Sequence, residues 1–132
     1  MAHAWSRLWS RFRLRKEPDP RIVLVDGGID IVSSSDAQTR ASVRWRNVAR
    51  ILTYKVDLLT TDCICLLFEF IDGSPAVQVS EEWGGFDEIF GPLSAAFPTI
   101  PSDWYLAVMT PAFEANRRVL YDSEMHSQLG VV

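Results

Sequence analysis

The chain has 132 residues, of which 48% are hydrophobic and 23% charged. This length fits one domain with a proper core, and the composition excludes a long disordered chain, a collagen-like repeat and a disulfide scaffold. The net charge of −4 is unevenly distributed, because residues 1–16 carry five basic side chains and no acid while residues 17–132 are strongly acidic. Phosphate neutralisation needs a positive face, so the acidic body is not expected to bind nucleic acid.

Residues 1–16 form a basic arm whose spacing predicts an amphipathic helix. One face holds Trp5, Leu8, Trp9 and Phe12, and the other holds Arg7, Arg11 and Arg15. Aromatic residues opposite arginines are typical of helices that lie in a membrane interface, where anionic lipid attracts basic residues. Docking on the acidic body or on a partner, a targeting segment and a disordered leader stay open. Residues 17–20, Glu-Pro-Asp-Pro, end the pattern and predict a linker.

From Arg21 to Ser80 the pattern predicts antiparallel strands joined by turns. The expected strands are Arg21–Val25, Ile29–Ser33, Ser42–Tyr54, Cys63–Ile71 and Ala76–Ser80, with a polar loop over 34–40. Glycines 27 and 28 favour a tight hairpin between the first two strands, because glycine accepts positive φ. Asn47 is expected to interrupt the third strand, and the continuous apolar run of the fourth predicts a buried central strand.

The last third of the chain is predicted to be helical. Apolar spacing from Phe86 to Phe97 suits a helix, but Gly91-Pro92 lies inside it and predicts a kink or two short helices, with Pro92 opening the second. Ser102 is expected to cap a short helix that holds Trp104 and Val108. A further helix is expected to start at Thr110-Pro111, with Phe113, Val119 and Leu120 packing inward.

Strands first and helices afterwards indicate an α+β domain, not a parallel sheet with crossover helices. We expect an antiparallel bent sheet or half-barrel followed by C-terminal helices. The single domain would span 21–121, and residues 122–132 would be a frayed tail.

Several runs resemble a group of small bacterial proteins of unassigned function. The runs that carry this resemblance are Trp45-Arg46-Asn47-Val48-Ala49-Arg50-Ile51, Lys55-Val56-Asp57, Glu81-Glu82-Trp83-Gly84-Gly85-Phe86, Phe97-Pro98 and Pro111-Ala112-Phe113. That group is similar to pleckstrin-homology-like rolls. The resemblance implies a module that binds lipid head groups, peptides or partner proteins, and it implies no catalytic residue.

No metal or cofactor site is predicted from the residues. Cys63 and Cys65 lie two apart in an apolar run, and the imidazoles of His3 and His126 lie near opposite ends, which does not match the spacing of a zinc site. The thiols are expected to be buried small hydrophobes in a reducing compartment. No nucleophile motif or phosphate loop occurs, so we expect neither a catalytic residue nor a cofactor.

Carboxylates gather in the segment that follows the last predicted strand. Glu81, Glu82, Asp87 and Glu88 surround Trp83. They could form a solvated rim, an acidic partner-binding patch or, together with Asp57 and Asp62, a general acid–base pair. An exposed Trp83 would favour the partner-binding patch, because tryptophan is enriched in binding hot spots.

We therefore expect a non-enzymatic binding module that recruits a protein partner or an anionic membrane surface. It would be cytoplasmic, with peripheral membrane attachment through the arm, since no run is long enough to span a bilayer and no secretory signal is recognised. Three alternatives stay open: an inhibitor or immunity-type protein whose acidic face masks a basic toxin, a carboxylate-dependent enzyme, and a structural subunit that forms a homo-oligomer through aromatic residues.

Overall fold

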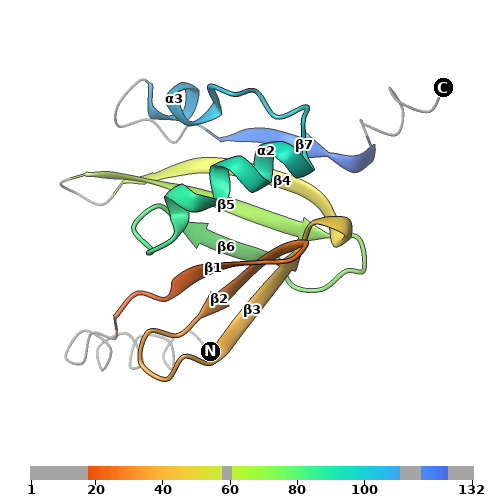
Figure 1. Cartoon of the computed structure of the whole chain (residues 1–132). Helices are drawn as coiled ribbons and strands as arrows, with labels where there is room; N and C mark the ends of the chain where they lie inside the picture. Colours follow the sequence, from red (N-terminus) through yellow and green to blue (C-terminus); the bar gives the residue numbers. More distant parts are fainter. Residues whose placement is uncertain (1–17, 58–60, 111–116, 125–132) are drawn as a thin grey trace, which may run out of the picture.

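The computed structural model describes residues 18–57, 61–110 and 117–124. Within these residues the protein is an α+β fold built from two antiparallel sheets and a few short helices (Figure 1). The predicted arm of residues 1–16 and the tail beyond residue 124 lie outside the described residues.

The first sheet is three-stranded, in the order β1 (Arg21–Val25), β2 (Gly28–Val32) and β3 (Thr39–Arg44). The second is four-stranded, in the order β6 (Val77–Ser80), β5 (Asp62–Phe70), β4 (Val48–Asp57) and β7 (Arg118–Asp122). The expectation of one bent sheet is therefore corrected to two separate sheets. A 3₁₀ turn, η1 (Trp45–Asn47), redirects the chain between β3 and β4, so these consecutive strands do not pair.

The core lies between the two sheets and the helices η2 (Phe86–Ile89), α2 (Phe90–Ala96) and α3 (Trp104–Met109). Alternate residues of the strands point into it, as the two-residue period of a strand requires. Its largest fully buried side chains include Ile29, Ile51, Leu66, Phe68, Phe86 and Leu93. Figure 1 shows α2 lying across the four-stranded sheet, which explains why Leu93 is buried.

Local signals predicted several elements correctly. The break at Asn47 is confirmed as η1, and the central, buried position of β5 is confirmed. The predicted division of the first helix is also confirmed, because the 3₁₀ turn η2 precedes α2. Pro92 does not open α2 as predicted: α2 begins at Phe90, and Pro92 lies in its first turn, where its missing N–H is tolerated.

The C-terminal prediction is wrong in its type of structure. Val119 and Leu120 lie in β7, a strand paired antiparallel with β4, and not in a helix. Without β7 the outer edge of the long strand β4 would present unpaired backbone groups, and this tertiary requirement overrides the local helical pattern. Asp122 ends β7, so it is not part of a frayed tail.

Several boundaries also differ from the predicted ones. Asp103, not Ser102, is the N-cap of α3, and its side chain makes no capping hydrogen bond. Thr110 is the C-cap of α3, whereas Pro111 lies outside the described residues. β3 begins at Thr39, inside the predicted polar loop, because Thr39 pairs with Val32 across a β-bulge.

Candidate functional site

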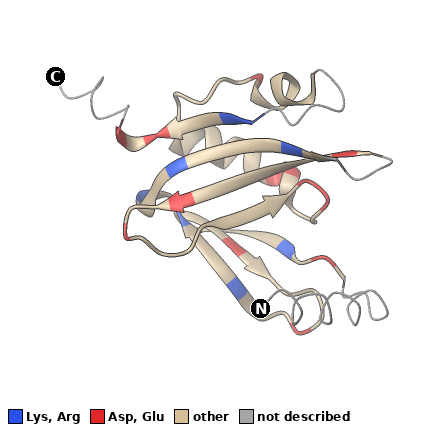
Figure 2. Ribbon diagram, turned by 180° about the vertical axis from the view of Figure 1, so that it is seen from behind, with Lys and Arg blue, Asp and Glu red and all other residues tan. Residues whose placement is uncertain are grey.

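Two surfaces are candidate binding sites, and they lie at opposite ends of β1 (Figure 1). At one end, Ile22 N–H donates to the Gly84 carbonyl at 2.8 Å, which ties the start of β1 to the acidic loop of residues 81–88. At the other end, Trp45 N–H donates to the Gly27 carbonyl at 2.9 Å, which ties the β1–β2 turn to η1. We call these surfaces the acidic loop and the η1 end. Seen from behind, the red residues of the acidic loop lie on the side away from η1 (Figure 2).

The acidic loop keeps a fixed backbone position because of Gly85. This residue has a φ of +89°, and a Cβ there would lie 2.1 Å from the Ile22 carbonyl oxygen. Only glycine fits both the left-handed conformation and the close approach of β1. The loop borders a hollow of about 200 Å³ lined in part by Trp83, Asp87 and Glu88.

Glu81 has a structural role within the acidic loop. Its Oε1 accepts the Ile64 N–H at 2.8 Å, and its Oε2 accepts the Tyr105 hydroxyl. Burial, with this hydrogen bond to Glu81 as the next cause, raises the pKa of Tyr105 to about 12. Glu81 therefore joins β5 to α3 and differs from the exposed carboxylates around it.

The other predicted members of the acidic patch are placed differently. Glu82, Asp87 and Glu88 are exposed, and Trp83 is half-buried and packs against the core. Trp83 thus anchors the loop to the domain, and two of the three exposed carboxylates, Asp87 and Glu88, line the hollow.

Asp62, a candidate for acid–base chemistry, is engaged in an ion pair. Its Oδ2 lies 3.5 Å from Lys55 Nζ, and that ammonium, buried beneath α3, also donates to the Met109 carbonyl at 3.1 Å. Within the described ranges, no group of three or more histidine, cysteine or acidic residues could hold a metal ion. The described carboxylates therefore form either ion pairs and structural hydrogen bonds or an exposed rim.

The two thiols are free and buried, which confirms the prediction for Cys63 and Cys65. Cys63 Sγ lies 3.0 Å from Ser80 Oγ. Burial, and then the neighbouring Cys63, raises the pKa of Cys65 to about 12, so its thiol stays protonated at neutral pH.

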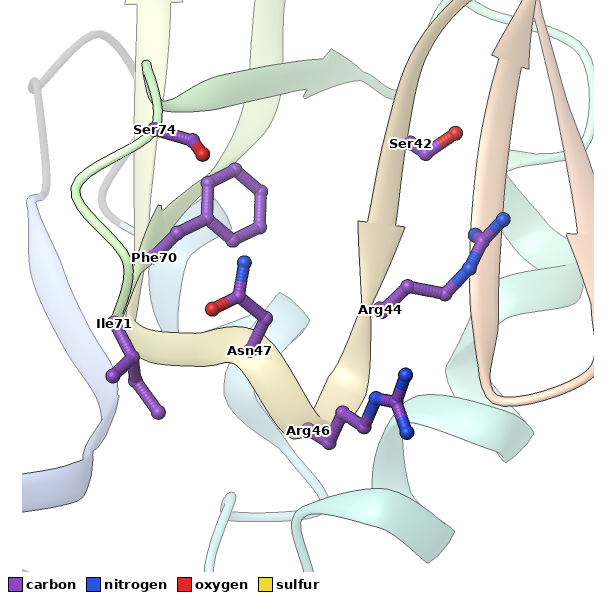
Figure 3. A pocket seen from close by; sticks show the side chains of 7 residues that line it. All are labelled: Ser42, Arg44, Arg46, Asn47, Phe70, Ile71 and Ser74. Atoms are coloured by element: carbon purple, nitrogen blue, oxygen red, sulfur yellow. The ribbon is translucent and has the colours of Figure 1, made fainter.

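The η1 end carries two grooves that the sequence did not predict. The first, of about 480 Å³, is lined by Ser42, Arg44, Arg46, Asn47, Phe70, Ile71 and Ser74 (Figure 3). The second, of about 430 Å³, is lined by Trp45, Arg46, Val48, Ile71, Ala96, Phe97, Pro98, Thr99 and Tyr121. Arg46 and Ile71 line both grooves, so they lie where the two grooves meet, and Ile71 is 64% exposed. We call these two residues the ridge.

The two arginines of the η1 end differ in their partners. Arg44 is held by Asp30 at 3.0 Å and donates to the Ile29 carbonyl at 3.3 Å. Arg46 is exposed, and its guanidinium makes no ion pair with any residue that the structure describes. Within the described ranges, Arg46 therefore supplies the available positive charge at this end.

The polar groups around Ser74, at the side of the first groove away from Arg44, also have hydrogen-bond partners. Hydrogen bonds from Ser74, and a weaker one from Asn47, lower the pKa of Asp72, so this carboxylate stays ionised beside the groove. The Ile71 N–H donates to the Asn47 carbonyl at 2.8 Å, which fixes the 71–74 turn against η1. The backbone of η1 is thus held in place, and among the residues that the structure describes Arg46 is the cation of this end without an ion-pair partner.

The sequence held one signal for this surface. Ile71 comes directly after the strand, immediately before Asp72-Gly73, where a turn exposes its side chain. Its partners could not be found in the same way, because Trp45, Ile71 and Phe97 meet only through tertiary packing.

Comparisons with known proteins return nothing for this chain: no family model, no curated protein and no solved structure matches it. In the described part of the chain, no helix has the length and apolar character needed to cross a membrane. The arm residues that we singled out, Trp5, Arg7, Leu8, Trp9, Arg11, Phe12 and Arg15, lie outside the described residues.

Proposed function

We propose that this protein is a non-enzymatic binding module that recruits a protein partner through the η1 end. The observation that carries the proposal is the ridge itself: Ile71, which is 64% exposed, and Arg46, which has no ion-pair partner among the described residues, both border the two grooves. Burial of an exposed apolar side chain favours association, and arginine and aromatic residues are enriched where binding energy concentrates.

Rigidity supports the same proposal. Two backbone hydrogen bonds, from Trp45 to Gly27 and from Ile71 to Asn47, hold the ridge to both sheets. A preformed surface loses less conformational entropy on binding than a flexible loop does. The proposal includes the pleckstrin-homology-like roll that the resemblance implies, since modules of that kind bind peptides or partner proteins.

Photocrosslinking tests the proposal in the cell that makes the protein. A benzophenone amino acid at Ile71 should yield a discrete crosslinked protein, and adding Arg46→Glu should weaken that product. The matched control is the same probe at Leu106, which is 66% exposed on α3. A product of equal yield from Leu106, or none from Ile71, would contradict recruitment through the η1 end.

Peripheral membrane attachment is the second candidate, favoured by the arm. Trp5, Leu8, Trp9 and Phe12 would insert into the interface while Arg7, Arg11 and Arg15 meet lipid phosphates. In liposome flotation, anionic vesicles should carry the full chain and neutral vesicles should not, and Trp9→Glu should abolish flotation. Equal flotation with both vesicle types, or none with either, would remove this candidate.

The acidic loop favours a third arrangement, in which exposed Glu82, Asp87 and Glu88 mask a basic protein. Reversing these three charges to lysine would then weaken the complex. Unchanged affinity of the reversed variant for a captured basic partner would exclude this inhibitor-type function.

A further inference from the structure

We infer that the grooves of the η1 end take an extended segment of a partner protein, with one carboxylate on Arg46 and apolar side chains in the grooves on either side. The inference rests on the proposed function and adds the chemistry of the partner. Its basis is the shape, the lining and the charge of this surface.

Shape favours an elongated ligand. The grooves of about 480 and 430 Å³ share only Arg46 and Ile71, so a ligand that occupies both must cross the ridge between them. An extended chain advances about 3.3 Å per residue and directs neighbouring side chains to opposite sides. A short segment can therefore place one side chain on the ridge and others in the two grooves.

The lining of the second groove suits an apolar anchor. Trp45 and Phe97 meet edge to face with ring centroids 5.8 Å apart, and the Phe97 and Tyr121 rings lie 4.6 Å apart. Trp45 and Tyr121 are half-buried, so this aromatic cluster is fixed by the core but still reaches the surface. Rigid aromatic rings of this kind accept large apolar side chains at a small entropic cost.

The charge of the ridge matches one carboxylate and not a phosphate dianion. Arg44 is neutralised by Asp30 at 3.0 Å, and the ionised Asp72 adjoins the far wall of the first groove. Of the described cations that line the grooves, Arg46 is left to meet an anion, and a guanidinium binds a carboxylate through two parallel hydrogen bonds. A dianion would lack its second positive partner and would be repelled by both aspartates.

Peptide selection tests the inference with the full chain. Random peptides displayed on phage are selected on the wild-type protein, and the enriched peptides are measured by fluorescence polarisation. We expect an aspartate or glutamate flanked within a few residues by large apolar side chains. Arg46→Glu should weaken binding about tenfold, and Ile71→Asp should also weaken it. The control Arg40→Glu, at an exposed arginine paired with Asp36, should bind as the wild type does.

A double-mutant cycle makes the contact specific. Changing the peptide's acid to its amide should lower the binding affinity about as much as Arg46→Gln does. Both changes together should lower the affinity little more than either alone. Additive losses, enrichment of basic peptides or no enrichment would each overturn the inference.

Other occupants of the grooves have their own readouts. If the chain's residues 125–132 filled them, Leu129→Asp would tighten peptide binding; if a second copy did, light scattering would show a dimer that Arg46→Glu dissociates. Either result contradicts the inference. If a partner crosslinks at Ile71 and its yield does not change with Arg46→Glu, the proposed function would stand and only this inference would be removed.

Discussion

At the scale of single residues, Glu81 shows how a residue predicted for binding can instead hold the fold. Its carboxylate accepts one hydrogen bond from the backbone of β5 and one from Tyr105 of α3. Removal leaves a half-buried N–H and a hydroxyl without their partner, so Glu81→Ala should lower the free energy of unfolding by about 1–3 kcal/mol. Urea unfolding measures this.

Two variants control that measurement. Glu81→Gln keeps an oxygen for the Ile64 N–H and should cost less than the alanine. Glu82→Ala, at the exposed neighbour, should change stability by less than about 0.5 kcal/mol. An equal loss at positions 81 and 82 would show that Glu81 belongs to the solvated rim.

Tyr105 and Cys65 predict a loss of stability at alkaline pH. Folding raises the pKa of Tyr105 from 10.0 to about 12 and that of Cys65 from 9.0 to about 12. Between these limits the unfolded chain releases protons that the folded chain keeps, so the stability that is complete below pH 9 is lost progressively as the pH rises towards 12.

The variant Tyr105→Phe separates the contribution of the tyrosine. Phenylalanine has no proton to lose, so the free energy of unfolding of the variant should fall less steeply than that of the wild type between pH 10 and 12. Denaturant unfolding at a series of pH values gives both slopes. Parallel curves would mean that the Tyr105 hydroxyl is not protected in the folded protein.

At the scale of elements, substitutions at three glycines separate the free-energy cost of a steric clash from the cost of left-handed backbone strain. Gly85→Ala should cost about 3 kcal/mol or more, because a Cβ at 2.1 Å from the Ile22 carbonyl adds a clash to left-handed strain. Gly73→Ala, with φ of +78° and open space, should cost about 1–2 kcal/mol from strain alone. Gly91→Ala in α2 should stabilise by up to about 1 kcal/mol. Any other rank order in thermal unfolding would contradict the packing of β1 on the acidic loop.

The strand β7 gives a second test at this scale. Leu120 is buried and Val119 is 53% exposed. Leu120→Ala should therefore cost about 3 kcal/mol, whereas Val119→Ala should cost less than about 0.5 kcal/mol. The helix predicted from the sequence would have packed both side chains inward, so similar losses at the two positions would favour that helix.

The elements that could be predicted have local causes. The β1–β2 hairpin, the break at Asn47 and the division before α2 follow from glycine, asparagine and proline at fixed positions. β7 could not be predicted in this way, because what makes it a strand is the edge of β4, which is distant in the sequence. The acidic loop was visible as a run of carboxylates, but the hydrogen bonds of Glu81 depend on β5 and α3.

At the scale of the whole molecule, the two ends of β1 present surfaces of opposite charge. The acidic loop presents Glu82, Asp87 and Glu88, and the η1 end presents Arg46 and the exposed Ile71. This separation could not be predicted from the net charge, because it depends on how two sheets are joined through η1. It also means that substitutions at one end can serve as controls for the other.

Quantitative capture of the crosslinked partner compares the two ends directly. The full-length wild type, an Arg46→Glu/Ile71→Asp variant and a Glu82→Lys/Asp87→Lys/Glu88→Lys variant are measured against that partner by calorimetry, after circular dichroism shows that all three are folded. Recruitment through the η1 end predicts that the first variant loses most of its affinity and the second binds as tightly as the wild type or more so. Loss of binding by the acidic-loop variant alone would contradict it.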